Sequence, residues 1–197
     1  RGAREEREER TRARREKPPP HARHPLPRLC STNPLNIFAA HDVCGFADGG
    51  MATKATVHFN LFAGTVLKLG TARHVEPLQP LIDRLDVTGC FGLTELGFGN
   101  NAVEMGTTAT YDPPTQTWDV HTPTTLAQKY WITNGAVHAQ WAIVFARLLV
   151  AGRDEGVHGL LVRIRNPDLS VVPGVSIHDM GVKMGLNGVD NGKLSFK

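Results

Sequence analysis

The sequence predicts an α+β protein in which an N-terminal helical segment is followed by an antiparallel β-barrel or β-sandwich domain. Up to residue 85, apolar residues recur at the spacing of a helix face. Beyond Asp86, Thr and Val become frequent, turn residues recur, and apolar residues alternate with period two, which is typical of strands. The 197 residues, 41% of them hydrophobic, are sufficient for a domain with a sizeable core. The sequence holds no apolar run near the roughly 20 residues of a transmembrane helix, so we expect no membrane span.

Three regions are expected: a charged, proline-rich extension at 1–33, part of a helical domain at 34–86 and a β domain at 87–197. Residues 1–17 hold seven Arg, one Lys and five Glu, and three prolines follow directly. Such a block cannot bury an apolar face, which predicts a disordered extension. Because the positive excess lies within this extension, we expect no nucleic acid among the partners of the folded part. An RNA-binding arm is the alternative, and its binding would depend steeply on salt.

Helical spacing predicts the elements of the first folded region. Three helices are expected there, at 35–47, 52–69 and 76–85. Gly70 is placed to end the second helix in the way of a C-terminal cap. Pro77 and Pro80 fall near the expected start of the third helix, where proline is tolerated.

Alternating patterns predict the elements of the β domain. Strands are expected at 106–111, 117–122, 141–150, 157–164, 170–175 and 193–196. Turn residues at 112–116 predict that the first two strands form a hairpin. The run Asp190-Asn191-Gly192 predicts a second tight turn.

The sequence favours neither a disulfide scaffold nor a metal site. The three cysteines, Cys30, Cys44 and Cys90, are odd in number and lack the spacing of zinc ligands. His138 and His158 are isolated from one another, which favours structural histidines. No metal ligand is therefore expected.

The first segment that could carry chemistry is 90–101, which reads CFGLTELGFGNN. Its glycines would let the backbone approach a ligand closely. Thr94 offers a hydroxyl, and Asn100 and Asn101 offer amides. Taken alone, the segment favours an ordinary loop, because a lone GxG pair is weak evidence for phosphate binding.

The second segment is 129–136, which reads KYWITNGA. Two adjacent aromatic residues, a hydroxyl and an Asn-Gly turn could place a large ring against a flat ligand. Taken alone, the segment favours a strand that ends in a turn, with Trp131 in the core.

Together, in this order, the two segments resemble the flavin-contacting elements of the acyl-CoA dehydrogenase and acyl-CoA oxidase superfamily, a TE-x-G-x-G loop and a WITNG strand end. These elements belong to the middle β domain of that superfamily. The helical stretch at 59–64 is similar to its N-terminal α domain. Four further stretches resemble the peroxisomal acyl-CoA oxidase branch, at 106–113, 122–124, 156–159 and 183–192. The resemblance covers roughly residues 35–197.

The resemblance implies FAD as the cofactor and assigns residues to it. The implied cofactor contacts are Phe91, Leu93, Thr94, Glu95, Gly97, Gly99, Trp131, Ile132 and Thr133. Thr94 would hydrogen-bond the edge of the flavin, Trp131 would pack beside the isoalloxazine, and Thr133 would hydrogen-bond near N5. Asn100 and Asn101 are the implied substrate contacts.

The resemblance also implies that the catalytic base comes from a C-terminal helical bundle, which is missing here. No catalytic residue is therefore assigned to this chain, and Glu95 is not the base of the superfamily. The stop at Lys197, inside an expected strand, leads us to expect a fragment that is inactive alone and holds FAD weakly.

The implied activity is conversion of a fatty acyl-CoA to the trans-2-enoyl-CoA in fatty-acid β-oxidation, with release of H2O2. The implied partners are fatty acyl-CoA and molecular oxygen, with a homodimer for the full-length protein and the peroxisome as its location. Two alternatives stay open within this resemblance. One is an acyl-CoA dehydrogenase that uses an electron-transfer partner, and the other is a non-catalytic remnant of the FAD domain.

Overall fold

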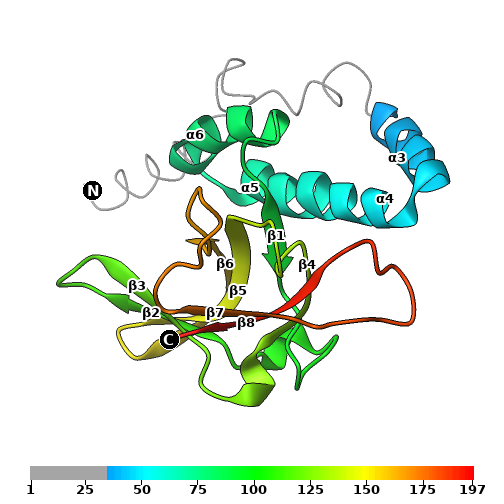
Figure 1. Ribbon diagram of the computed structural model, residues 1–197. Coiled ribbons are helices and arrows are strands. Elements are labelled where there is room, and N and C mark those ends of the chain that lie inside the picture. Colours follow the sequence, from blue (N-terminus) through cyan, green and yellow to red (C-terminus); the bar gives the residue numbers. More distant parts are fainter. Residues whose placement is uncertain (1–34) are drawn as a thin grey trace.

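The computed structural model describes residues 35–197, in which helices come first in the chain and strands follow (Figure 1). The extension expected at 1–33 lies outside the described residues. The helices gather on one side of the molecule, and the strands form the rest (Figure 1). The order predicted from the sequence, helices before sheets, is confirmed.

The long helix predicted at 52–69 is present and begins three residues earlier. It consists of α4 (Gly49–Thr56), a π-helical segment (Val57–Ala63) and α5 (Gly64–Leu69). Asp48 caps its start by accepting a hydrogen bond from Gly50 N–H at 2.8 Å. The preceding helix, α3 (Asn36–Ala47), agrees with the prediction within one residue.

The third helix, α6 (Ala72–Asp83), begins four residues before the predicted start. Thr71 and His74 form a reciprocal cap there, with the Thr71 N–H donating to His74 Nδ1 at 3.2 Å. Pro77 and Pro80 consequently lie inside the helix, where each removes one backbone donor. The sequence does not predict this early start, because prolines are typical of the first turn of a helix.

The first sheet contains β1 (Gly89–Gly92), β2 (Thr108–Asp112), β3 (Thr117–His121), β5 (Trp141–Val150) and β6 (Arg153–Arg163). Strands β1 and β2 pair in succession with the same edge of β5, and both run parallel to it. The hairpins β2–β3 and β5–β6 are antiparallel. The sheet is therefore mixed, and the prediction of a purely antiparallel domain is wrong here. The physical reason is the long loop from β1 to β2, which brings the chain back to the same edge further along β5, at 147–149 after 141–144.

The second sheet contains β4 (Lys129–Thr133), β7 (Val175–Asp179) and β8 (Asn191–Phe196), in the antiparallel order β4-β8-β7. The strand predicted at 170–175 is wrong, because this range holds an isolated bridge at Val171 and continuous pairing begins at Val175. The tight turn predicted at Asp190-Asn191-Gly192 is also wrong, because β8 already begins at Asn191. The described strands form two open sheets, so the barrel is not confirmed. Short 3-10 turns occupy Ala102–Glu104 and Thr125–Ala127.

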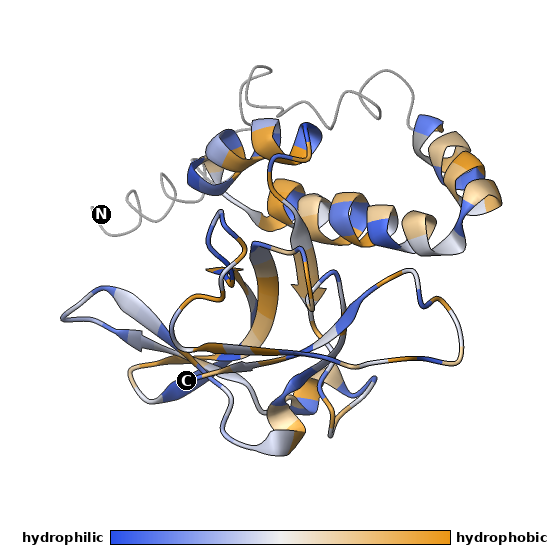
Figure 2. Cartoon of the chain, in the orientation of Figure 1, coloured by the Kyte–Doolittle hydropathy of each residue, from blue (hydrophilic) through white to orange (hydrophobic). Residues whose placement is uncertain are grey.

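Two apolar clusters hold these layers together. One lies between the sheets and includes Val144, Ile132 and Phe196. The other joins the helices to the first sheet, with Phe62 against strand residues such as Ile143. Figure 2 shows apolar residues along β5 and along the helices that cover it. Among the described helices, none is long and apolar enough to cross a membrane.

Gly89 marks the point where the helical layer meets β1. A Cβ atom at this position would lie 2.2 Å from the ring of Phe62, so only glycine fits. Phe62 itself is fully buried. The contact fixes the π-helical segment directly above the strand that leads into the first motif segment.

Candidate functional site

The two motif segments, 35 positions apart in the sequence, lie side by side in the structure. The Tyr130 N–H donates to the Thr94 carbonyl at 2.9 Å. Three residues further along the loop, the Gly97 N–H donates to the Leu126 carbonyl at 2.8 Å. The loop after β1 therefore runs along β4 and the turn before it, and both motif segments border one site.

A buried ion pair joins the two segments. Lys129 Nζ lies 2.8 Å from Glu95 Oε1, and neither side chain is exposed. Glu95 also accepts hydrogen bonds from the backbone N–H groups of Gly106 at 2.7 Å and Thr107 at 3.0 Å. Burial lowers the pKa of Lys129, and Glu95 opposes that effect. The Glu95 carboxylate therefore holds the loop from inside and does not reach the open edge of the site.

Trp131 lies at the open edge. Its backbone adopts a φ of +63°, and the pairing of β4 with β8 shifts register between Lys129 and Ile132. Ile132 is buried in the core, whereas 54% of Trp131 is exposed. The interpretation that places Trp131 in the core is therefore wrong. A bulky residue with positive φ is costly, and such backbone strain concentrates at functional sites.

Two threonine hydroxyls form hydrogen bonds near Trp131 in the chain, one at the residue before it and one two residues after it. The Thr94 hydroxyl donates to the Tyr130 carbonyl at 2.6 Å. The Thr133 hydroxyl accepts a hydrogen bond from Asn191 Nδ2 at 2.9 Å. The Thr94 hydroxyl thus acts as a donor through its proton, and the Thr133 hydroxyl acts as an acceptor through one lone pair.

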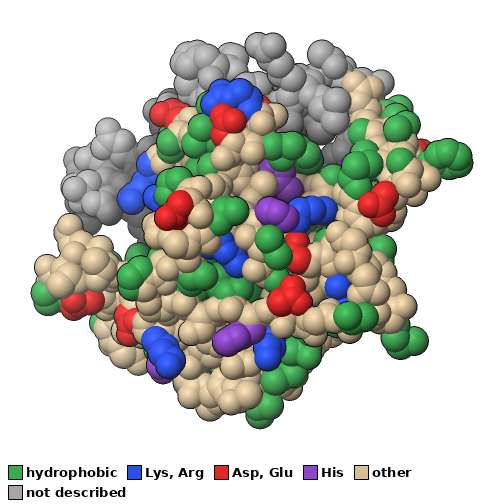
Figure 3. Space-filling view, in the orientation of Figure 1, with side chains coloured by type: hydrophobic (Ala, Val, Ile, Leu, Met, Phe, Trp, Pro, Cys, Tyr) green, Lys and Arg blue, Asp and Glu red, His purple; other side chains and the backbone are tan. Residues whose placement is uncertain are grey.

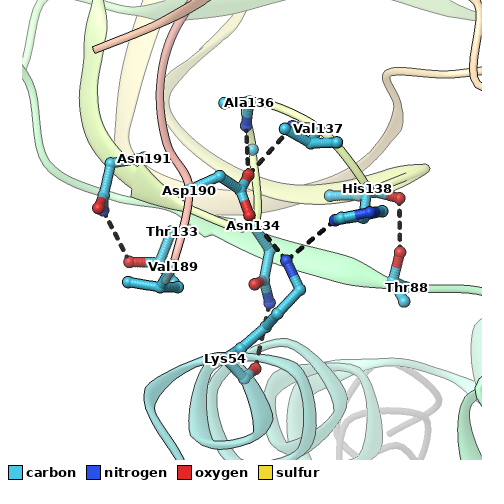
Figure 4. A network of polar contacts seen from close by, with 12 residues as sticks. Lys54, Thr88, Thr133, Asn134, Ala136, Val137, His138, Val189, Asp190 and Asn191 are labelled. Carbon is cyan, nitrogen blue, oxygen red and sulfur yellow. Dashed lines mark hydrogen bonds and ion pairs between the residues drawn. The ribbon is translucent and has the colours of Figure 1, made fainter. Parts of the chain in front are cut away.

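A polar network fastens the turn after β4 to the helices (Figure 4). Asp190 Oδ2 accepts hydrogen bonds from the N–H groups of Ala136 at 2.9 Å and Val137 at 3.0 Å. Asp190 Oδ1 lies 2.7 Å from Lys54 Nζ on α4, and Lys54 Nζ lies 3.1 Å from His138 Nδ1. Burial raises the pKa of Asp190, but Lys54 and the turn amides outweigh it, so that pKa lies below its usual value.

Asn134, in the same turn, ties the helical and sheet layers together. Its side-chain amide donates to the carbonyls of Lys54 at 3.2 Å and Gly89 at 3.4 Å. Its φ is +68°, a conformation that Asn tolerates better than most residues. The Asn-Gly turn expected within the second motif segment is present, and it connects the helical and sheet layers.

The sequence does not reveal the role of Asp190, Asn191 and Gly192, because these residue types predict a tight turn. In the structure each member has a separate contact. Asp190 holds the neighbouring turn, and Asn191 holds the hydroxyl of Thr133. A Cβ at Gly192 would lie 2.9 Å from the backbone nitrogen of Ala136, so glycine is needed for close approach.

The remaining residues of the predicted site fall into two groups. Phe91 is half-buried and packs against Phe145, with ring centroids 4.9 Å apart, so its ring belongs to the core. Leu93 is also half-buried. The first group thus comprises four residues whose side chains are buried or half-buried: Phe91, Leu93, Glu95 and Ile132.

The exposed group comprises Gly97, Gly99, Asn100 and Asn101, together with Thr94. Gly99 has a φ of +52°, where glycine is favoured. A Cβ at Gly97 would lie 2.7 Å from Leu126 Cβ, so the loop passes close to the turn before β4. These residues lie on the loop that borders Trp131 and Thr133.

An open cavity of about 760 Å³ lies beside the Asp190 network. Its lining includes Lys54, His138, Asp179, Lys183 and Asp190. Figure 3 shows histidine, basic and acidic side chains together on this face, where the helices meet the sheets. The cavity carries both charge signs, so its lining selects neither an anion nor a cation.

A metal site and a reactive thiol each need a specific arrangement of side chains. Residues 35–197 contain no group of three or more His, Cys, Asp or Glu side chains arranged to hold a metal ion. Burial raises the pKa of the Cys90 thiol to about 12, which keeps it protonated and unreactive. Cys44 is also a free thiol, and Cys30 lies outside the described residues.

Comparison with known proteins gives a consistent set of relatives. Residues 90–197 match the family described as "Acyl-CoA dehydrogenase, middle domain". Peroxisomal acyl-coenzyme A oxidase 3 of Arabidopsis thaliana is 43% identical over 171 residues, which cover 85% of this chain and 25% of the relative. Peroxisomal acyl-coenzyme A oxidase 3 of Homo sapiens is 39% identical over 166 residues, covering 83% and 24%.

Solved structures agree with the sequence comparison. Acyl-CoA oxidase 1 from Yarrowia lipolytica aligns with a TM-score of 0.81 at 35% identity, over 87% of this chain and 26% of the other. Acyl-CoA oxidase-1 from Caenorhabditis elegans, complexed with FAD and ATP, aligns with a TM-score of 0.70 at 32% identity, over 72% and 22%. The chain thus spans about a quarter of the length of these relatives.

Proposed function

The chain belongs to the family of the acyl-CoA dehydrogenase middle domain, and from that premise we propose that it is the FAD- and acyl-CoA-binding portion of a peroxisomal acyl-CoA oxidase. The proposed reaction converts a fatty acyl-CoA to the trans-2-enoyl-CoA and yields H2O2. Residues 34–86 would contribute part of the α domain, and residues 87–197 would form the middle domain. The observation that carries this proposal is the exposed Trp131 at a positive φ, next to the residue whose carbonyl accepts from Thr94 and two residues before Thr133.

The residues at this edge fit a flat, polar-edged ring. Trp131 offers an exposed aromatic face held in one backbone conformation. Thr94 retains lone pairs after donating to Tyr130, and Thr133 retains its proton after accepting from Asn191. The edge thus provides an apolar face with both an acceptor and a donor, which matches the isoalloxazine of FAD. When bound, FAD would supply the redox chemistry, which is the removal of a hydride from the substrate and the delivery of electrons to oxygen.

The loop bordering Trp131 would complete the binding surface. Gly97 and Gly99 would let its backbone approach the cofactor closely. Asn100 and Asn101, both exposed, would contact the acyl-CoA. Phe91, Leu93, Glu95 and Ile132 would act through their backbone or by supporting this surface, because their side chains are buried or half-buried.

Removal of the α proton requires a carboxylate within hydrogen-bond reach of that proton. Glu95 cannot serve, because its carboxylate is committed to Lys129 and two backbone N–H groups. We therefore place the base outside this chain, in the C-terminal helical bundle that the superfamily resemblance implies. Turnover of palmitoyl-CoA by the purified 197-residue chain alone would contradict this placement.

The remaining parts of the proposal follow from the relatives. Molecular oxygen is the acceptor in an oxidase, and the relatives from Arabidopsis and human are named peroxisomal. The peroxisome is therefore the proposed location. A homodimer is the proposed assembly of the full-length enzyme.

A chimaera tests the proposed function directly. In the Arabidopsis relative, the 171-residue matched stretch is replaced by the corresponding residues of this chain. The expected result is a yellow protein that forms H2O2 when palmitoyl-CoA is added. Reduction of an electron-transfer protein without peroxide would favour the dehydrogenase. A folded chimaera that fails to retain FAD would overturn the proposal and favour the non-catalytic remnant.

A further inference from the structure

We propose that Asn191 is a positioning residue that fixes the hydroxyl of Thr133 as a hydrogen-bond donor toward the cofactor edge of the site. The inference deepens the proposed function and depends on it. It assigns a role to a residue outside the two motif segments. The link between Asn191 and Thr133 crosses from β8 to β4, and Figure 4 shows it as a dashed line.

The geometry places the two residues in direct contact. Thr133 and Asn191 are register partners in the antiparallel β4–β8 pair. Asn191 Nδ2 lies 2.9 Å from Thr133 Oγ1 and donates to it. Asn191 is only 3% exposed, so its amide is enclosed, while Thr133 is half-buried and therefore partly open to solvent.

This contact decides the direction in which the Thr133 hydroxyl donates. A hydroxyl carries one proton and two lone pairs, and the amide of Asn191 occupies one lone pair. Within residues 35–197, the structure gives the Thr133 proton no acceptor. The proton is therefore available on the side away from Asn191.

Thr94, whose hydroxyl meets the residue before Trp131, provides a contrast. Its hydroxyl donates to the Tyr130 carbonyl at 2.6 Å, so its proton is used and its lone pairs remain. The edge around Trp131 is thus polarised, with an acceptor at Thr94 and a donor at Thr133. The ring nitrogen N5 of oxidised flavin is an acceptor, which pairs with the donor that Asn191 orients.

The choice of Asn at this position is not explained by strand formation. Asn is depleted in strands relative to Val or Thr, and a buried amide needs partners to offset its desolvation. Its neighbours Asp190 and Gly192 are each explained by their contact with the 134–137 turn. For the side chain of Asn191, the contact that the structure shows is the hydroxyl of Thr133.

A double-mutant cycle tests the assignment. Asn191→Asp replaces the amide donor with an acceptor, so the Thr133 proton would turn inward. Asn191→Leu removes the donor while keeping a similar size. It replaces Asn191→Asp in the test if the buried charge of that variant prevents folding. Both changes are made in the wild-type chain and in Thr133→Val, and Ser195→Ala on the same strand is the matched control.

The measurement is the dissociation constant of oxidised FAD, followed by quenching of flavin fluorescence in the full 197-residue chain. Thermal unfolding of each variant accompanies it. We expect Asn191→Asp to weaken FAD binding about fivefold, the loss of one net hydrogen bond, and Asn191→Leu to weaken it less. In Thr133→Val, both changes are expected to shift the dissociation constant by less than about twofold. Ser195→Ala is expected to bind as the wild type does.

Two results separate failure of this inference from failure of the proposed function. If wild type binds FAD and Asn191→Asp weakens it equally with and without Thr133, Asn191 acts structurally and the inference is overturned alone. If wild type shows no saturable FAD binding at all, the proposed function fails and the inference fails with it.

Discussion

Lys129 and Glu95 form an ion pair of 2.8 Å in which neither side chain is exposed to solvent. One partner comes from each motif segment, so this buried ion pair holds the loop against β4. Two backbone N–H groups complete the coordination of the carboxylate. The site above it depends on this pair for its shape, although neither charge reaches the ligand edge.

Breaking this pair from one side should destabilise the protein strongly. Glu95→Gln leaves the ammonium of Lys129 buried without its counter-charge, and we expect a loss of about 3–5 kcal/mol in the free energy of unfolding. The double variant Glu95→Gln/Lys129→Met should recover a large part of that loss. Urea denaturation at pH 7 measures both. A single variant as stable as wild type would contradict the assignment of Glu95 to the interior.

The backbone at Trp131 predicts an unusual order of stabilities. At a φ of +63°, glycine avoids the strain that a Cβ atom causes, which is worth about 1–2 kcal/mol. Trp131→Gly should therefore be more stable than Trp131→Ala by about 1 kcal/mol, opposite to the order in an ordinary strand. Thermal unfolding of the two variants decides it. Equal stability, or a more stable alanine variant, would show that the residue is unstrained.

Asp190 should contribute a pH-dependent part of the stability. Because its pKa is lowered in the folded state, its contribution is present above the usual Asp pKa and is lost as pH falls through the folded-state pKa. We expect Asp190→Asn to be about 2 kcal/mol less stable than wild type at pH 7. The gap between the two should narrow at pH 3, as measured by urea denaturation. A gap independent of pH would mean that Lys54 and the turn amides do not stabilise the charged form.

The contact between Gly89 and Phe62 predicts that a smaller side chain at position 62 reduces the loss of stability caused by a larger one at position 89. Gly89→Ala brings a methyl group within 2.2 Å of the Phe62 ring, and we expect a loss of about 1–3 kcal/mol from overpacking. Phe62→Leu alone should also destabilise, but it should reduce the further cost of Gly89→Ala. Thermal unfolding of the four proteins gives the coupling. Additive losses would show that the two residues do not meet.

The sequence was sufficient where local pattern and tertiary environment agree. The helical periodicity of 52–69 and the apolar run of β5 predicted elements that the structure confirms, β5 with the same bounds. The two motif segments were expected to act together, and their hydrogen bonds do place them side by side. Each of these signals is carried by residues close together in the chain.

Other features depend on contacts between residues far apart, which local patterns do not encode. Asp190-Asn191-Gly192 has residue types typical of a turn. In the structure Asn191 and Gly192 pair with β4, and Asp190 accepts a hydrogen bond from the turn that follows β4. The parallel pairing of β1 and β2 with β5 depends on the path of a long loop. Local pattern, taken alone, favours Trp131 in the core, because the register shift between Lys129 and Ile132 has no local sequence marker.

The central claim is that the edge around Trp131 binds FAD. The most direct test is titration of FAD into the purified chain, comparing wild type with Trp131→Ala and with Trp118→Ala, a partly exposed tryptophan on β3. The account predicts saturable binding to wild type and Trp118→Ala, and about tenfold weaker binding to Trp131→Ala, since stacking on an aromatic ring contributes up to about 1.5 kcal/mol beyond burial. Binding of equal strength to all three proteins, or no binding to wild type, would contradict it.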